Sequence, residues 1–259
     1  MSNLTFLTNN RLLEGEVSMI TGTENAQFPL KNIKHAFTTK VFRSNEGYVE
    51  LLIDLKATDD INAFAIVGSS VNGLGFGDVK LQGSLSTDFT GSPVIPVDVS
   101  ANHNFGFALF EPEGAFRFWK LTFTNTGGDY VEVSNLYLGD KTEIVTNGIT
   151  TESFKYSNED NLNISANKYG QKFIDKFNNI KTLEGEVKFV NAEEFDLLND
   201  MYIQTGQHLP VWALVDPEGQ MGEDSEFMFS GYFYFGKDLK WQLAAPFLYN
   251  VKINLIEAT

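Results

Sequence analysis

The sequence contains no cysteine in its 259 residues. Disulfide bridges, thiolate metal sites and cysteine nucleophiles are therefore excluded, and so are the disulfide-rich scaffolds of small secreted proteins. The fold must be held together by the burial of apolar side chains. Hydrophobic residues make up 42% of the chain and include 23 phenylalanines, so the material for a packed core is ample.

Basic residues are scarce, and long apolar runs are missing. The 19 Lys and Arg residues face 34 Asp and Glu residues, which gives a formal net charge of -15 that both halves of the chain share. Such a charge repels phosphate groups and anionic lipids, so we expect no nucleic-acid partner and no membrane partner. No apolar segment reaches the roughly 18 residues of a membrane span, and the N-terminus has no export-signal pattern.

Catalytic motifs are missing as well. The histidines His35, His103 and His208 lie far apart, and none belongs to a metal-binding pattern. Neighbouring acids such as Glu223 and Asp224 lie in polar loops, which is typical of a solvated surface and not of the facing carboxylates of a glycosidase. We therefore predict that the protein is not an enzyme and that it holds no cofactor and no metal.

Alternating apolar residues indicate that the first part of the chain is an antiparallel β-sandwich. Short strand-like segments are separated by clusters of Gly, Asn, Asp and Ser. The uniformly apolar Ala63–Val67 fits a central strand covered on both sides. Two other segments alternate, and their predicted inward positions are Val49, Leu51, Ile53 and Leu55 in the first and Val79, Leu81 and Leu85 in the second.

The segment FRFWKLTFTNTGGDYVEVSNLYLGD, from Phe116 to Asp140, alternates twice. Trp119, Leu121 and Phe123 share one face of its first strand, and Gly127-Gly128 allows the positive φ of a tight reversal. The alternation resumes with Val131 and Val133 and continues, after a change of phase, with Leu136 and Leu138. We interpret the segment as a hairpin, and we place Trp119 in the core.

The second part of the chain predicts one helix among antiparallel strands. Asn191 caps the helix with Glu194 three residues on, and Gly206 ends it. Its apolar stripe is Phe195, Leu198 and Tyr202. Strands are predicted at Glu184–Val190, Pro210–Val215, Phe227–Phe235 and Tyr249–Ile256. Such a segment order is typical of an α+β module with a helix on one face of a sheet.

Segments of both parts follow a recognisable order. The first part contains NAQFPLKNI, KVFRS, YVELLIDLKATDDINAFAIVGSSV and the closing FRFWKLTFTNTGGDYVEVSNLYLGD. Together these resemble the discoidin-like (galactose-binding-like) jelly rolls of bacteriophage virion proteins, with Phe42 where the family commonly has Trp. The second part contains LEGEV, the capped helix, LPVWALVDPEG, FMFSGYFYFG and YNVKINLIE, and it is similar to the C-terminal module of phage tail-tip structural proteins.

The resemblance implies a mainly β chain with an N-terminal jelly-roll β-sandwich at residues 1–140. A connector at 141–165 and a smaller α+β module at 166–259 would follow. The implied role is a non-enzymatic structural component of a phage tail, of the tail-tip, distal-tail or adaptor type. It would assemble into a symmetric homo-oligomeric ring that links other virion tail proteins. The expected location is the virion, after synthesis in the host cytoplasm.

An alternative function is that of a carbohydrate-binding module protein that recognises a cell-surface glycan. Two predicted loops carry amide and aromatic groups suited to sugars, namely Asn72, Phe76, His103 and Asn104. Candidate interface residues for a protein partner lie in the aromatic strand and are Tyr232, Phe233, Tyr234 and Phe235. The competing interpretation of that strand is burial on both sides by its own helix and a neighbouring sheet.

Overall fold

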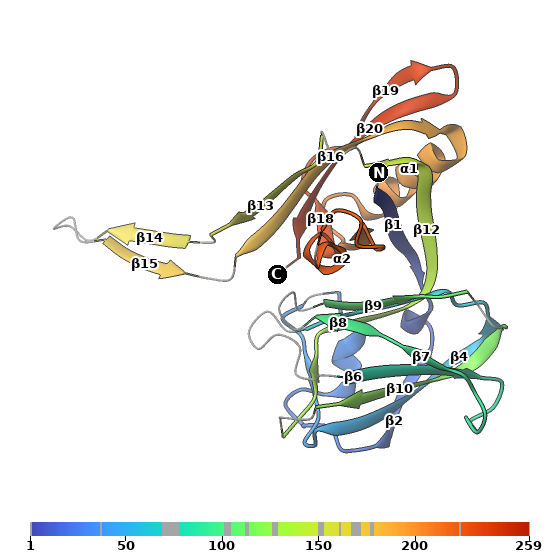
Figure 1. Cartoon of the computed structure of the whole chain (residues 1–259). Coiled ribbons are helices and arrows are strands. Elements are labelled where there is room, and N and C mark those ends of the chain that lie inside the picture. Colours follow the sequence, from blue (N-terminus) through green and yellow to red (C-terminus); the bar gives the residue numbers. More distant parts are fainter. Residues whose placement is uncertain are drawn as a thin grey trace. The chain divides into compact units, whose positions relative to one another are not determined.

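The alternating segments of the first half form two facing β-sheets. The computed structural model describes residues 2–36, 38–68, 78–100, 105–111, 114–125, 129–149, 153–160, 162–166, 172–176, 179–222 and 224–258. The chain divides into two units, each drawn in Figure 1. We call Thr5–Glu143 with Trp212–Gly231 the sandwich unit. The remainder, Met1–Leu4, Ile144–Val211 and Tyr232–Thr259, is the helix unit.

The first sheet of the sandwich unit has five strands. In spatial order these are β2 (Glu16–Thr21), β4 (Tyr48–Asp59), β10 (Phe116–Thr124), β6 (Asp78–Ser84) and β7 (Val94–Pro96). Leu121 of β10 lies opposite Leu51 of β4 and Leu81 of β6, which aligns the apolar faces of the three strands. Trp119, Leu121 and Phe123 are at most 1% exposed, which confirms their predicted place in the core.

The second sheet lies across this core (Figure 1). Its spatial order is β17 (Val211–Val215), β1 (Ser2–Asn10), β12 (Asn135–Ile149), β5 (Ala63–Val67), β9 (Phe105–Leu109) and β8 (Asp98–Ser100). β5 pairs with β12 on one side and with β9 on the other. Phe64 and Ile66 face the core cluster, and Ala63 and Ala65 are equally buried, so the prediction of a central strand is confirmed. Two 3-10 turns, η1 (Arg11–Leu13) and η2 (Leu30–Lys34), complete the described helical segments of this half.

The predicted hairpin from Phe116 to Asp140 is wrong. β10 pairs with β4 and β6, whereas β12 pairs with β5, so the chain crosses from one sheet to the other between them. A short strand, β11 (Glu132–Val133), lies on the way and pairs with β3 (Phe42–Arg43). Alternation gives each strand an apolar face but does not tell adjacent strands from facing ones. Here the faces of β10 and β12 meet across the core. Gly127-Gly128 lies outside the described residues.

Leu85 is the exception among the predicted inward positions. Val79 and Leu81 are buried, and so are the four positions predicted in β4, but Leu85 is 67% exposed. β6 ends at Ser84, before Leu85 is reached. The inward position before it is Gly83, where a Cβ atom would lie 2.4 Å from the ring of Phe116. The Phe116 ring therefore occupies the space that a side chain at position 83 would fill.

The outer face of the second sheet is covered by a segment from late in the sequence. The ring of Trp212 lies 6.2 Å from that of Phe105 and 6.0 Å from that of Tyr137. Phe227 lies 5.6 Å from Phe107. The segment includes the helical turn α2 (Ser225–Met228), so the expected strand begins only at Gly231. The intervals 1–140, 141–165 and 166–259 predicted from the sequence differ from the two units chiefly in this segment.

The sequence predicts a connector at 141–165, and part of that interval belongs to the strand β12. The strand continues from Asn135 to Ile149. Gly139 lies within it, and a Cβ atom there would come 1.8 Å from the backbone oxygen of Asn9. Glycine is required at this point because β1 approaches the backbone too closely for any side chain. Gly139 thus marks a close contact between β1 and β12.

The helix unit is an antiparallel sheet with one main helix. Its strands are β13 (Lys155–Glu159), β16 (Ile180–Asn191), β20 (Leu248–Glu257), β18 (Gly231–Phe235) and β19 (Lys240–Ala245), and a separate pair is formed by β14 (Leu162–Ala166) and β15 (Lys172–Lys176). The helix α1 (Ala192–Thr205) begins with the predicted capping box of Asn191 and Glu194 and ends at Gly206. This confirms the predicted fold class, a mainly β chain with a sandwich and a smaller α+β part. None of the helices in the described ranges is long and apolar enough to cross a bilayer.

Candidate functional site

The residues predicted to bind a glycan, Asn72, Phe76, His103 and Asn104, lie outside the described residues. Their role stays a prediction.

The candidate interface strand β18 is largely enclosed by its own chain. Tyr232, Phe233 and Phe235 are 8%, 0% and 1% exposed, and only Tyr234 is partly exposed. The ring of Tyr202 on α1 packs edge-on against Phe235 at 5.2 Å, and burial raises the pKa of Tyr232. The strand therefore fits the competing interpretation of burial, and a partner contact through these residues stays a prediction.

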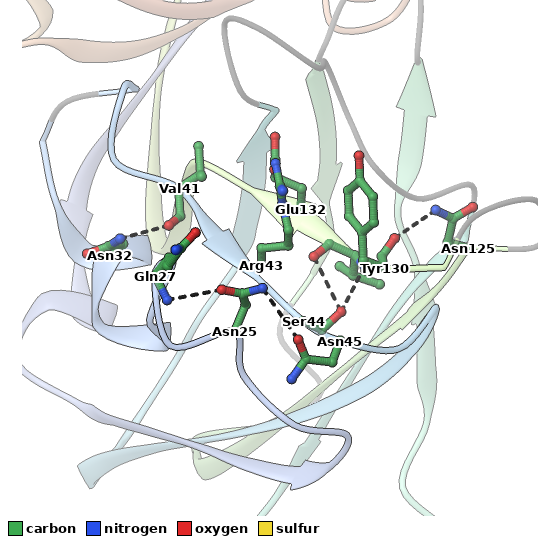
Figure 2. A network of polar contacts seen from close by, with 11 residues as sticks. Asn25, Gln27, Asn32, Val41, Arg43, Ser44, Asn45, Asn125, Tyr130 and Glu132 are labelled. Carbon is green, nitrogen blue, oxygen red and sulfur yellow. Dashed lines mark hydrogen bonds and ion pairs between the residues drawn. The ribbon is translucent and has the colours of Figure 1, made fainter.

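A polar cluster in the sandwich unit is built around Arg43. β3 and β11 pair so that Arg43 lies directly opposite Glu132. Arg43 Nε donates to Glu132 Oε2 at 2.6 Å, and its Nη2 contacts the same oxygen. The Glu132 side chain is fully buried, whereas that of Arg43 is 25% exposed. Figure 2 shows the pair among the surrounding loop residues. The buried carboxylate fixes the guanidinium while leaving part of it accessible.

The guanidinium of Arg43 packs against two aromatic rings, those of Phe28 and Tyr130. Its carbon atom lies 4.4 Å from the centre of the Phe28 ring and 4.7 Å from the centre of the Tyr130 ring. Both rings are only partly buried. Contacts of this kind stabilise a cation over an aromatic face and restrict its motion. Arg43, Phe28 and Tyr130 together form what we call the Arg43 cluster.

Hydrogen bonds fix the loops that carry this cluster. The backbone N–H of Arg43 donates to the carbonyl of Phe28 at 3.0 Å, and that of Asn25 donates to the carbonyl of Arg43 at 2.8 Å. The Asn45 amide bridges the Thr23 hydroxyl and the Glu24 carbonyl, each at 3.1 Å. The loops are therefore ordered before any ligand arrives, which lowers the entropy cost of binding.

Two further amide side chains form hydrogen bonds with the backbone of these loops. The Asn125 amide donates to the carbonyl of Tyr130 at 2.8 Å, and Asn25 Oδ1 accepts from the backbone of Gln27 at 3.0 Å (Figure 2). The side chains of Gln27 and Asn45 are exposed. The Arg43 cluster thus offers a fixed cation, two ring surfaces and exposed amides within one set of loops.

The Arg43 cluster was not predicted from the sequence. Glu132 stands between Val131 and Val133, so alternation places it on the outward face, yet all three residues are fully buried. β11 is only two residues long, and Arg43, 89 positions away, supplies the charge that makes burial of Glu132 tolerable. No pattern within either segment identifies that partner. Among the residues that the structure describes, no group of three or more His, Cys, Asp or Glu could hold a metal ion.

Comparisons with known proteins identify solved structures only. No family model and no curated protein matches the sequence. A family 32 carbohydrate-binding module from Clostridium perfringens, solved with galactose, is 13% identical with a TM-score of 0.41 and covers 54% of this chain and 99% of its own. A chitosan-binding module from a Paenibacillus chitosanase/glucanase is 14% identical with a TM-score of 0.43, covering 51% of this chain and 99% of its own. A fucose-binding module of Streptococcus pneumoniae is 10% identical with a TM-score of 0.43, covering 51% and 98%. Each of these similarities covers about half of this chain.

Proposed function

We propose that the protein is a non-catalytic binding protein whose sandwich unit recognises a carbohydrate. The observation that carries this proposal is the Arg43 cluster, in which a partly exposed guanidinium is held between Phe28 and Tyr130. Sugar hydroxyls accept hydrogen bonds from guanidinium and amide groups, and the C–H face of a sugar packs on aromatic rings. The cluster presents these groups on loops that a rigid sandwich positions.

The proposal predicts selective binding on a glycan array and its loss when the exposed ring is removed. We expect Tyr130→Ala to weaken binding by about tenfold, because one aromatic contact supplies an energy of that order. Phe247→Ser is the matched control, since it removes an exposed ring from the helix unit. Isothermal titration with the selected glycan would measure both variants. Equal affinity of Tyr130→Ala and the unchanged protein, or an array without any selective signal, contradicts the proposal.

A structural role in a phage tail is the second candidate, and one surface favours an assembly role of this kind. Trp241, Leu243 and Phe247 on the β19–β20 hairpin are 55%, 62% and 77% exposed. We call these three residues the hairpin patch. β19 pairs only with β20 among the described strands, so its other edge is open. Exposed apolar groups beside an open strand edge are typical of surfaces that contact other proteins.

The assembly role predicts a concentration-dependent homo-oligomer. We expect the double variant Leu243→Asp and Phe247→Asp to shift the protein to monomers, because charged side chains are costly to bury in an interface. Sedimentation velocity over a hundredfold concentration range would detect the shift, and Leu13→Asp, at an exposed position of the sandwich unit, is the control. A protein that is monomeric throughout the range, and absent from purified virions, would contradict the tail role.

A further inference from the structure

One face of the sheet in the helix unit carries charged side chains, whereas the other face carries buried apolar side chains. The pairing of β13, β16, β20 and β19 places Lys155 opposite Glu184, and Glu184 opposite Asn254. The next row places Glu186 opposite Lys252, and Lys252 opposite Lys240. The alternate positions are apolar and buried, among them Val187, Val251 and Leu255. Because side chains alternate across a strand, the two charged rows share one face.

This face forms a groove of about 410 Å³. The volume lies within the range of about 300–1,000 Å³ that is usual for small-ligand sites. Four lysines line the groove, namely Lys155, Lys237, Lys240 and Lys252, together with three acids, Glu184, Glu186 and Asp238. In a chain with a net charge of -15, a groove with a surplus of cations is unusual.

Two of the three acids are already engaged within the unit. Lys237 Nζ donates to Glu184 Oε1 at 2.6 Å, and the hydrogen bond and charge of Lys237 lower the pKa of Glu184. Asp238 Oδ1 accepts from the Tyr202 hydroxyl at 3.0 Å and from Gln207 at 2.9 Å. Glu186 is the third acid of the groove, and its carboxylate makes no hydrogen bond or ion pair with the residues that the structure describes.

Of the remaining lysines, Lys155 lies opposite Glu184 and Lys252 lies opposite Glu186, whereas the residue opposite Lys240 is another lysine. Within the described part of the chain, Lys155, Lys240 and Lys252 form no ion pair. Lys240 and Lys252 lie directly opposite each other on neighbouring strands. Like charges at opposite positions of an antiparallel pair destabilise the sheet. An anion between them would convert this repulsion into two charge-assisted hydrogen bonds.

Asn254 adds a polar group at the floor of the groove. It is 9% exposed, and its Nδ2 donates to Glu184 at 2.8 Å. Its Oδ1 is buried and has no hydrogen-bond partner among the residues described. A buried acceptor without a donor costs free energy. This oxygen is enclosed, since a Cβ atom on Gly236 would lie 2.1 Å from it, so the acceptor available to the hydroxyl groups of a ligand is Glu186.

We propose that this groove binds an anionic polyol, a sugar or glycerol unit carrying one carboxylate or phosphate group. Lys240 and Lys252, which lie opposite each other, contact the anionic group, and Glu186 accepts from the hydroxyls. The acids of the groove repel a chain of closely spaced phosphates, so the site selects a single charge on a hydroxylated ligand. This site lies in the helix unit and is separate from the Arg43 cluster of the sandwich unit.

The test is titration calorimetry of the full chain at low salt with three probes. A disaccharide containing glucuronic acid carries the carboxylate, glycerol 3-phosphate carries the phosphate, and glucose is the neutral control. We expect binding of at least one acidic probe and none of glucose, and the two acidic probes show whether the groove prefers a carboxylate or a phosphate. Each of Lys240→Gln and Lys252→Gln should weaken that binding about tenfold or more, because each removes a charged hydrogen bond.

Lys80→Gln is the matched control, because Lys80 is an exposed lysine of the sandwich unit. Thermal unfolding of each variant verifies that the fold is kept. The Tyr130→Ala variant should still bind the acidic probe. The proposal for the groove and the proposal for the Arg43 cluster are therefore tested separately. Absence of binding by both acidic probes, or unchanged affinity in Lys240→Gln and Lys252→Gln, overturns the proposal.

Discussion

Replacement of Trp119 by alanine is expected to lower the free energy of unfolding by about 3–5 kcal/mol, the usual cost of removing a large buried ring. Trp119 is 1% exposed and lies in β10, the central strand of the first sheet. Its ring packs against Phe116 at 5.8 Å and Phe110 at 6.1 Å. Because β10 pairs with β4 and with β6, the backbone around the cavity is held in place and collapse of the cavity is limited. Urea unfolding followed by circular dichroism would measure the loss.

Trp119→Phe is the control for this prediction. Trp119 Nε1 is buried and has no hydrogen-bond partner within the described structure. Phenylalanine removes that unpaired donor and keeps most of the ring, so the loss of volume is partly offset. We expect the loss in free energy of unfolding for Trp119→Phe to be less than half of the loss for Trp119→Ala. Equal losses in the two variants would show that the ring is not packed as described.

Replacement of Arg43 by alanine is expected to cost about 3–5 kcal/mol, because it leaves a buried carboxylate without its partner. Glu132 is fully buried, and Arg43 donates a hydrogen bond to it and supplies an opposite charge. The variant also removes the cation that Phe28 and Tyr130 enclose. The expected result is a large fall in the urea midpoint, with an unchanged dependence on denaturant.

The double variant Arg43→Met and Glu132→Leu separates the pair from its surroundings. Replacing both partners with apolar side chains removes the unpaired charge, so stability should return to near that of the unchanged protein. Carbohydrate binding should nevertheless be lost, because the guanidinium is gone. A double variant as unstable as Arg43→Ala would mean that the loops, and not the charge pair, depend on Arg43.

The sequence predicts the local elements of this protein well, for physical reasons. The inward residues of β4 and the capped helix α1 follow from side-chain spacing and from hydrogen bonds that neighbouring residues make. Strand partnership is different, because β10 and β12 carry equivalent apolar faces and only the folded chain decides whether they pair or face each other. The strand β19 was not predicted, because it has no buried face and therefore shows no alternation of apolar and polar residues.

The candidate site depends on distant partners and was therefore beyond the sequence. Arg43 and Glu132 are neighbours only because β3 and β11 pair across the fold. The lysine-lined groove requires the register of four strands, since Lys155 and Lys252 come from segments that resemble ordinary polar strand faces. The glycan loops predicted from composition, with Asn72, Phe76, His103 and Asn104, lie outside the described residues and stay a prediction.

The covering of the second sheet by Trp212–Gly231 has a consequence for synthesis. A ribosome releases this segment only after the whole of Ile144–Val211 has emerged. Until then the rings of Trp212 and Phe227 are not available to cover Phe105, Phe107 and Tyr137. The nascent chain therefore exposes an apolar surface. A product that stops at the end of β12 would therefore be an unfinished sandwich, and we expect it to be recovered with chaperones or in aggregates.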